Sequence, residues 1–420
     1  MAAEPATTAG GESPARDEPT AFWLAMVTAF VFGALFSLFP VTFPVLKRAF
    51  ATNLEQMGRV QLVSFLSSLG VSVLGGWFVG HLGLRRAAAV SLLLLALGVA
   101  VVGAAPAYAV VLLGAALFGL ALAGIAVIGN SVISDHLPHK QQSVFFASGM
   151  SGALGATLGP ALLGYWLGYA QRCGLSWRLG YFGVAALLLA AAIWALLLDP
   201  RAFAHGVHGR QGPSEALLAM RQVLRSPALY FLGLAMFLHS VAQVGMTSWT
   251  GQLYQKRLSI NAAQAAYFLS LNSAGFFGGR VLLGWITSRR KVPQLLVLAL
   301  CAAGGTVAFL ATIASHSYLA ALAAFTLAGV FISGDAPSVN SFAGLRFAQR
   351  TTTAFALLGG IGNLGAAAGP YLTGLMGARF GLETAIRSMP VFSLALALLA
   401  VAWYLRDGPR TRRPSLGDAR

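Results

Sequence analysis

Apolar residues fall in about twelve long runs, and short polar segments separate them. The first six runs cover residues 21–46, 58–80, 87–105, 107–133, 143–168 and 177–198, and the second six cover 228–249, 262–287, 292–314, 317–342, 351–377 and 385–405. About 20 apolar residues cross a hydrocarbon core of roughly 30 Å as an α-helix, whereas the strands of a membrane barrel alternate over only about ten residues. The pattern therefore predicts an all-α membrane protein with 12 transmembrane helices.

The longest polar break, DPRAFAHGVHGRQGP at 199–213, divides these runs into six and six. We expect one six-helix bundle over 21–198 and a second over 227–405, joined by a cytoplasmic linker over 199–226. Within the linker, Ser214 is a candidate N-cap for a short amphipathic helix on the inner membrane surface. Residues 1–20 are expected to form a disordered cytoplasmic tail, and residues 406–420 a basic cytoplasmic tail.

Composition and charge agree with a membrane protein. Hydrophobic residues make up 57% of the chain and charged residues 10%, where soluble proteins have about 25% charged residues. The net charge of +16 does not indicate nucleic-acid binding, because 18 of the 28 Lys and Arg residues lie on the cytoplasmic side when the N-terminus is placed inside. The same bias places both termini in the cytoplasm. Richness in Ala, Gly and Arg suggests a bacterial inner membrane.

The two halves repeat each other. At an offset of 210 residues, Gly119, Gly124, Gly149, Gly152, Gly155, Gly159 and Gly164 match Gly329, Gly334, Gly359, Gly362, Gly365, Gly369 and Gly374. Pro160 matches Pro370, and Asn130-Ser131 matches Asn340-Ser341. At an offset of 208, Gly76-Trp77 matches Gly284-Trp285. Because each half has an even number of spans, the repeat is parallel, with a pseudo-two-fold axis along the membrane normal.

These features resemble the major facilitator superfamily of secondary transporters, from about residue 20 to 405. The family motif GxLaDRxGRR after the second helix reads GWFVGHLGLRR at 76–86, with Gly80 in place of the usual Asp. Its second copy, GWITSRRK at 284–291, has Ser288 at that place. In the family this Asp helps to latch the inner face closed against the opposite half. The resemblance implies two bundles that rock around a central site, without the usual charged latch.

The segments GALGATLGPALLG at 152–164 and GNLGAAAGPYLTG at 362–374 resemble the family's fifth-helix motif. Glycine at every fourth position lets helix backbones approach closely in lipid, and an intrahelical proline can bend the helix. The resemblance implies that these two helices lie between the halves as sliding surfaces; ordinary tight packing is the alternative. The residues assigned to packing or gating are Gly76, Gly155, Gly159, Pro160, Gly365, Gly369 and Pro370.

Arg280 and Asp335 are the only Arg, Lys, Asp or Glu residues placed well within spans, and they share a depth. An unpaired buried charge costs several kcal/mol, on the order of the penalty for burying one ion, so we expect one of two arrangements. Either the two side chains pair, or Arg280 binds a substrate anion while Asp335 titrates as a proton-coupling carboxylate. The position of Arg280 on the eighth span is similar to that of an Arg associated with the substrate carboxylate in transporters resembling monocarboxylate and oxalate carriers.

Neutral polar residues in the second half form a further candidate lining. His239 and Gln243 are four residues apart on one helix face, and Asn272 and Asn363 lie in the eighth and eleventh spans. His239 could relay protons, since its unperturbed pKa is near 6.5. The set would equally suit a sugar or polyol. We interpret Trp249 and Tyr254, near the outer end of the seventh span, as anchors at the membrane interface, with a gate as the alternative.

Together these observations predict a secondary transporter that moves a small solute by alternating access, with a small organic anion favoured. A carrier of a neutral solute and a non-transporting sensor are the alternatives, and uniport, symport and antiport all remain open. HExxH, GxSxG and phosphate-binding Gly-Lys motifs are absent from the sequence, so we expect no enzyme, cofactor or metal site. The expected partners are the substrate, the lipid bilayer and, with coupling, protons; we expect a monomer and no nucleic acid.

Overall fold

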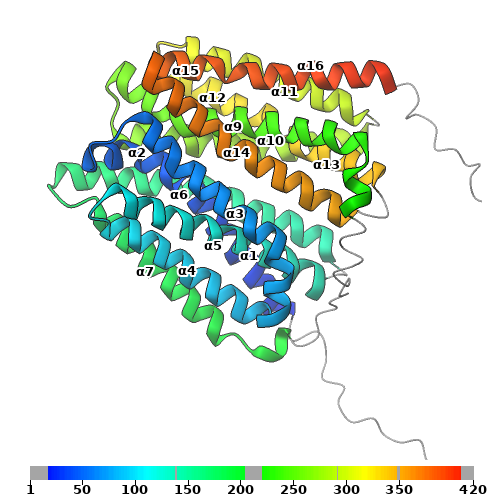
Figure 1. Cartoon of the computed structure of the whole chain (residues 1–420), viewed down its shortest axis with the longest axis horizontal. Helices are drawn as coiled ribbons and strands as arrows, with labels where there is room; N and C mark the ends of the chain where they lie inside the picture. Colours follow the sequence, from blue (N-terminus) through cyan, green and yellow to red (C-terminus); the bar gives the residue numbers. More distant parts are fainter. Residues whose placement is uncertain (1–17, 138–139, 204–219, 291, 348–350, 408–420) are drawn as a thin grey trace, which may run out of the picture.

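The computed structural model describes residues 18–137, 140–203, 220–290, 292–347 and 351–407. Over these residues every regular element is a helix (Figure 1). The first half contains α1 (Glu18–Phe36), α2 (Leu38–Ala49), α3 (Leu54–Leu82), α4 (Leu84–Ala104), α5 (Tyr108–His136), α6 (Gln141–Arg172) and α7 (Arg178–Leu197). The second half contains α9 (Pro227–Leu258), α10 (Ala262–Arg289), α11 (Gln294–Ala314), α12 (Tyr318–Ile332), α13 (Asp335–Arg346), α14 (Thr351–Phe380), α15 (Leu382–Ser388) and α16 (Pro390–Asp407).

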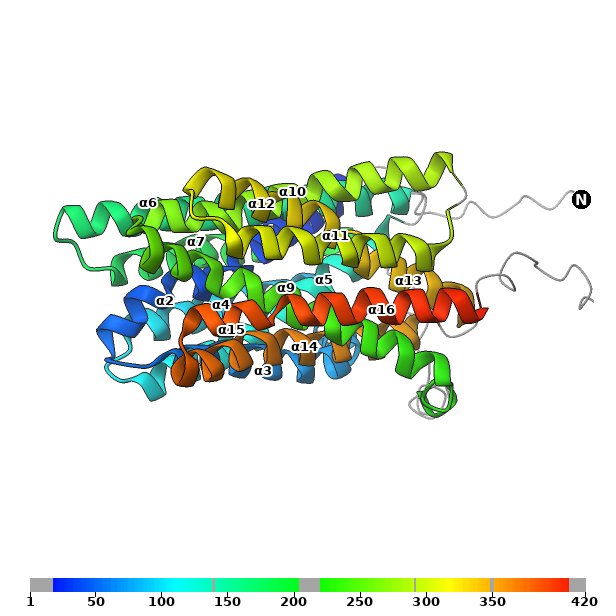
Figure 2. The same ribbon diagram turned by 90° about the horizontal axis from the view of Figure 1, so that it is seen from above.

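The helices run roughly parallel to one another, and their ends define two sides of the molecule (Figure 2). We call the end at which Glu18 and Asp407 lie the tail side, and the opposite end, with the connections at 50–53, 173–177 and 259–261, the loop side. Among the described residues, nine helical stretches are long and apolar enough to cross a membrane. With α3, α10 and α14, each of 28 to 30 residues, they make up the twelve predicted spans. The predicted all-α membrane fold is confirmed.

The two halves begin their second helices in the same way. Asn53 caps α3 in a reciprocal capping box with Gln56, and Asn261 caps α10 in the same box with Gln264, 208 residues later. In both boxes the asparagine side chain accepts from the backbone of the glutamine, and the glutamine side chain accepts in return. The internal repeat therefore extends to the hydrogen bonds that start these helices.

The first and tenth spans are interrupted where the sequence predicted continuous helices, and the twelfth is interrupted at Met389, between α15 and α16. The first span breaks at Ser37, between α1 and α2, and the tenth at Ser333 and Gly334, between α12 and α13. In each case a proline, Pro40 or Pro337, is the third residue of the following segment. Its missing N–H removes one helix hydrogen bond, and its ring crowds the preceding turn. By contrast, α6 and α14 continue through Pro160 and Pro370 without interruption.

The fifth and eleventh spans lie between the halves. Helix α6 packs against α1 of its own half and α10 of the other, and α14 packs against α9 of its own half and α3 of the other. The predicted sliding surface needs correction, however. A methyl group added to Gly155 would overlap the Phe30 carbonyl of α1, and one added to Gly365 would approach the Phe237 carbonyl of α9. These glycines, like Gly159 and Gly369, face their own half.

Contacts across the halves come from other small residues of α6 and α14. Gly164 lies against Ala266 of α10, and Gly374 lies against the Leu54 carbonyl of α3. Gly76 lies within α3, in a stretch whose side-chain surroundings the structure does not describe. The strips therefore hold each bundle together along most of their length and join the two bundles only near the loop side.

The linker is described in part. Residues 200–203 form a short 3-10 helix, and residues 220–224 are helical, with Val223 buried and Met220 and Leu224 exposed. The amphipathic helix on the membrane surface stays a prediction, because most of its residues lie outside the described ranges. Its expected cap, Ser214, and most of both predicted tails lie outside the described residues.

Candidate transport site

A cavity of about 1130 Å³ lies between the halves. Its walls come from α1, α5 and α6 of the first half and from α9, α10, α11 and the α12–α13 region of the second. Phe145, Thr287 and Gln294, which lie at the tail-side ends of their helices, belong to the lining. The cavity therefore extends toward the tail side, while the halves meet on the loop side.

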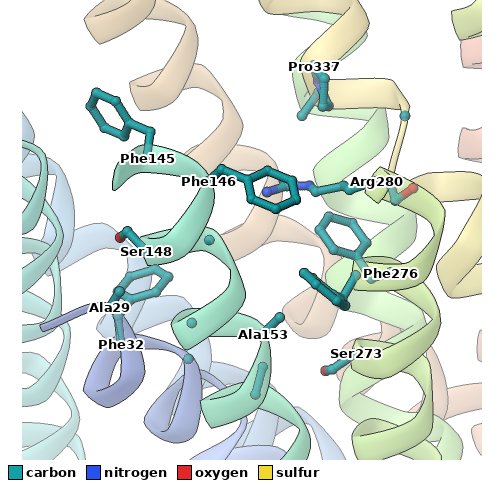
Figure 3. A pocket seen from close by; sticks show the side chains of 18 of the residues that line it. Ala29, Phe32, Phe145, Phe146, Ser148, Ala153, Ser273, Phe276, Arg280 and Pro337 are labelled. Atoms are coloured by element: carbon teal, nitrogen blue, oxygen red, sulfur yellow. The ribbon is translucent and has the colours of Figure 1, made fainter. Parts of the chain in front are cut away.

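Arg280 is the only charged residue among the described residues that line this cavity. It projects from α10 toward α6, with Phe276 of its own helix beside it (Figure 3). The guanidinium carbon lies 4.6 Å from the centroid of the Phe276 ring, a cation–π contact. Over the described part of the chain, no carboxylate lies within ion-pair distance of Arg280. The predicted pairing of Arg280 with Asp335 is therefore wrong.

Asp335 pairs instead with His239. The Nδ1 atom of His239 on α9 lies 2.9 Å from Oδ2 of Asp335 at the start of α13. Both side chains are almost fully buried, with 5% of His239 and 1% of Asp335 exposed. Neither is part of the cavity lining. Oδ1 of Asp335 is buried and has no hydrogen-bond partner within the described residues.

The predicted neutral lining is only partly assembled. Gln243 lines the cavity and is partly exposed to it. Asn272 also borders the cavity, but its amide donates to the Phe325 carbonyl of α12 over 2.8 Å, which joins α10 to α12. Asn363 lies on α14, outside the lining. The structure therefore brings Arg280, Gln243 and Asn272 to the cavity and leaves His239, Asp335 and Asn363 outside it.

Two groups of lining residues were missed as site candidates. The first is a set of six phenylalanines contributed by α1, α6 and α10: Phe32, Phe36, Phe145, Phe146, Phe276 and Phe277. The Phe-Phe pairs in α6 and α10 are visible in the sequence, but within apolar runs they do not stand out from lipid-facing residues. The second is Asn340 and its neighbours Ser338 and Ser341; Asn340 lines the cavity together with its repeat partner Asn130 of the first half.

On the loop side, five residues close the space between the halves: Phe43, Gln61, Ser248, Trp249 and Pro370, which we call the loop-side seal. Ser248 of α9 donates to Oε1 of Gln61 on α3 over 2.6 Å, and both side chains are buried. The ring of Trp249 lies 5.2 Å from that of Phe43 on α2, and its Nε1 donates to the Pro370 carbonyl over 3.0 Å. The seal contains no charged side chain.

This arrangement corrects the interpretation of Trp249 and Tyr254. Both are fully buried rather than placed at a lipid interface. Tyr254 donates to the carbonyls of Thr312 and Ser315 and stacks on Phe268, so it joins helices within the second half. Trp249 contacts the first half through Phe43. Of the two, Trp249 therefore has the position of a gate residue.

Arg85, one of the two arginines that end the first GxLaDRxGRR-like motif, makes its contacts within its own half. Arg85 donates to the carbonyls of Leu196, over 2.9 Å, and Leu198, over 3.0 Å, at the end of α7. It thereby satisfies carbonyls that the end of a helix leaves without partners. In the second copy, Ser288 donates to Trp285 of its own helix. The hydrogen bonds of both residues stay within their own bundle and do not cross to the opposite one.

The twelve-span bundle has a repeated half and a cavity between the halves, and a comparison with protein families agrees with this architecture. The family model for the Major Facilitator Superfamily matches residues 25–341 and 295–419. The chain belongs to the major facilitator superfamily. Members of this superfamily move small molecules across membranes, so both the membership and the fold point to transport rather than to an enzyme reaction.

Solved structures give the same result for the fold. Two crystal structures of a bacterial homologue of the human lysosomal transporter Spinster, both inward-facing, resemble this chain at 16% sequence identity. The unoccupied form has a TM-score of 0.75, covering 95% of this chain and 99% of that one, and the occupied form has a TM-score of 0.71, covering 94% and 99%. No curated protein matches this chain in sequence. The likeness shows a shared major facilitator fold.

Proposed function

We propose that this protein is a secondary transporter of small organic anions, with Arg280 as the binding residue for the anionic group. The observation that supports it is the position of Arg280, a cation that faces the central cavity without a carboxylate beside it. Removing a cation from water costs free energy unless an anion or hydrogen bonds compensate. A bound carboxylate would supply both, and a guanidinium can bind it through two parallel hydrogen bonds.

The rest of the lining favours an anion with an apolar body. Six phenylalanines surround the cavity, and four of them, including Phe145 and Phe146, come from α1 and α6 of the first half. Most of the polar lining, including Arg280 and Gln243, comes from the second half. A substrate that places its carboxylate toward α10 and its aliphatic or aromatic part toward α1 and α6 would match both walls.

We further propose that the His239–Asp335 pair is the proton site. It is buried, separate from the cavity, and has one free carboxylate oxygen. A site of this kind can exchange a proton without competing with the substrate for Arg280. With both termini in the cytoplasm of a bacterial cell, as the basic loops suggest, the cavity of this structure would face inward.

The test is uptake by purified protein in liposomes, using a panel of radiolabelled aliphatic and aromatic monocarboxylates with glucose and sorbitol as neutral solutes. Arg280→Gln should lower the initial rate of carboxylate uptake by about 10- to 100-fold, the effect of losing one hydrogen-bonded charge. Arg280→Lys should retain part of the rate. Arg289→Gln is the matched control, since Arg289 stacks on Trp285 at the tail-side end of the same helix.

A neutral substrate is the second candidate, because Gln243 also presents its amide to the cavity. Uptake of glucose or sorbitol that survives Arg280→Gln but falls in Gln243→Leu would favour it. A protein that moves none of these solutes, yet is stabilised by one of them in a thermal-shift measurement, would be a sensor. Carboxylate uptake that does not respond to a pH gradient would remove His239 and Asp335 from the coupling role.

A further inference from the structure

The tenth span is bent at one point of its length, and that point borders the cavity. Ser333 and Gly334, between α12 and α13, keep nearly helical backbone angles, with φ and ψ of −62° and −23° and of −86° and −15°. The interruption is therefore a kink, and the chain makes no loop there. Pro337 explains it, because its nitrogen cannot donate to the Ser333 carbonyl as a helix requires. The helical hydrogen bond to the Ser333 carbonyl is therefore missing at the kink.

The segment beyond the kink is a wall of the cavity. Seven consecutive or nearly consecutive lining residues come from the kink and α13: Ser333, Gly334, Ala336, Pro337, Ser338, Asn340 and Ser341. Three of them carry hydroxyl groups and one an amide, so this wall is polar. A change in the direction of α13 would change both the width of the cavity and the position of these polar groups.

One buried contact fixes the direction of α13 near the kink. Asp335, the first residue of α13, is bonded to His239 of α9. The titratable side chains that face Asp335 are His239 from α9 and Cys301 from α11, and Arg280 of α10 turns instead to the cavity. A proton gained or lost by this pair changes the charge of one partner, and with it the strength of the contact that attaches α13 to α9.

The kink also touches the helix that carries Arg280. A methyl group added to Gly279 would overlap the carbonyl of Val330 and the hydroxyl of Ser333, directly before the kink. Because successive residues of a helix are about 100° apart around its axis, Gly279 faces α12 and Arg280 faces the cavity. The backbone of α10 at the anion site therefore rests on the residues at which the tenth span bends.

We propose that α13 is a hinged wall of the cavity, which turns about Ser333 and Gly334 when the His239–Asp335 pair gains or loses a proton. This rests on the proposed function, and it adds an internal motion of the second half to the rocking of the two halves. The hinge changes the polar wall that adjoins α10 near Arg280 and thereby links the proton site to the anion site. Helix α13 has 12 residues and is about 18 Å long, so a turn of about 20° moves its far end by about 6 Å.

Paired spin labels on the purified full chain in lipid nanodiscs, without any substrate, test the hinge. One pair, Leu345→Cys on α13 and Leu405→Cys on α16, measures the segment beyond the kink; all four positions used are exposed. The other pair, Leu319→Cys on α12 and Val391→Cys on α16, measures the segment before it. The exposed Cys173 is replaced by Ser, and the buried Cys301 is kept.

Between pH 8 and pH 5, the Leu345–Leu405 distance should change by several ångströms, up to about 6 Å, while the Leu319–Val391 distance stays fixed. Pro337→Ala should abolish the change, because it restores the hydrogen bond to Ser333. Pro44→Ala, which removes another proline from a helix interior but far from the cavity, should not. If Pro337→Ala does not fold, His239→Gln serves instead, since Gln keeps a hydrogen bond but does not titrate.

Three results would overturn the hinge: no change with pH in the parent protein, an equal change in both label pairs, or an unchanged response in Pro337→Ala or His239→Gln. The first would leave α13 rigid, the second would mean motion of a whole bundle, and the third would place the cause elsewhere. A pH-dependent hinge together with no carboxylate uptake would reject the proposed function and keep the hinge.

Discussion

Helix α5 and the α12–α13 segment are the same element of the two repeats, and they differ in one turn. Their packing is equivalent: a methyl group at Gly119 would overlap the Ser64 carbonyl, and one at Gly329 would overlap the Asn272 carbonyl, at offsets of 210 and 208. Six residues further on, α5 has Ile125 where the second half has Asp335. Two residues later it has Val127 where the second half has Pro337.

The two copies share the residues that pack the helices and differ in the residues that carry charge or interrupt the helix. Both copies keep the glycines that set the distance between helices, so the duplication preserved the bundle. Only the second copy gained a buried carboxylate with its histidine partner and a proline that interrupts the helix. The cation of the cavity, Arg280, also belongs to the second half. The first half contributes mainly apolar walls, and its own interrupted helix is the first span rather than the fourth.

The largest effect is expected from breaking the buried pair. His239→Leu leaves the Asp335 carboxylate without its partner and should lower the free energy of unfolding by about 3–5 kcal/mol at neutral pH. The double variant His239→Leu with Asp335→Ile, which gives the second half the residue of the first, should recover most of this loss. Denaturant unfolding in detergent measures both.

The reverse substitution places a carboxylate in the first half. Ile125→Asp places a carboxylate at the equivalent, fully buried position of α5, with no histidine provided for it, and should destabilise the protein to a similar degree. A loss below about 1 kcal/mol in either single variant would mean that these positions do not hold a charge.

A smaller effect is expected from the glycine strips. Gly155→Leu and Gly365→Leu force a side chain into a neighbouring backbone and should each cost about 1–3 kcal/mol, equally in the two halves. Gly149 and Gly359 are the matched controls, because a Cβ at either would meet no atom within 4 Å. Unfolding midpoints of the four Leu variants check this, and a similar loss in all four would contradict a specific role for the tight pair.

The smallest effect is expected at the loop-side seal. Ser248→Ala removes the hydrogen bond to Gln61, worth about 0.6 kcal/mol within a membrane, and should shift the population toward the loop-side-open state about threefold. The reactivity of Val41→Cys, buried on the loop side, with a water-soluble maleimide reports the shift. Thr250→Ala is the control, since Thr250 is equally buried but bonds only within α9. Equal reactivity in Ser248→Ala and Thr250→Ala would argue against the seal.

The twelve spans and the repeat could be predicted because both depend on composition along the chain. The pairing of Asp335 could not be. Depth along a helix is readable from the sequence, and Arg280 and Asp335 do share a depth, but rotation about the axis decides which neighbour a side chain meets. Gly279, one residue before Arg280, is the one that faces α12. Similarly, the glycine strips indicated a close backbone without indicating whose it was.

The cavity lining shows the same limit. Phe145, Phe146 and Phe276 were indistinguishable from lipid-facing residues, since an apolar side chain is equally compatible with a bilayer and with a substrate pocket. Pro337 is also visible in the sequence, but the kink that it causes between α12 and α13 could not be predicted from it. Pro160 and Pro370 lie in helices that continue, whereas Pro337 follows Ser333 and Gly334 at a kink. Neighbouring helices decide which of these prolines bends its span.

Because the loop-side seal contains no charged side chain, dissolved salt should have little effect on it. Dissolved ions screen the attraction between exposed charges, with a screening length of about 10 Å at 0.1 M, but they hardly change a hydrogen bond between uncharged groups or the packing of two aromatic rings. The loop-side seal depends on Gln61, Ser248, Phe43 and Trp249. Its closure should therefore be nearly independent of ionic strength.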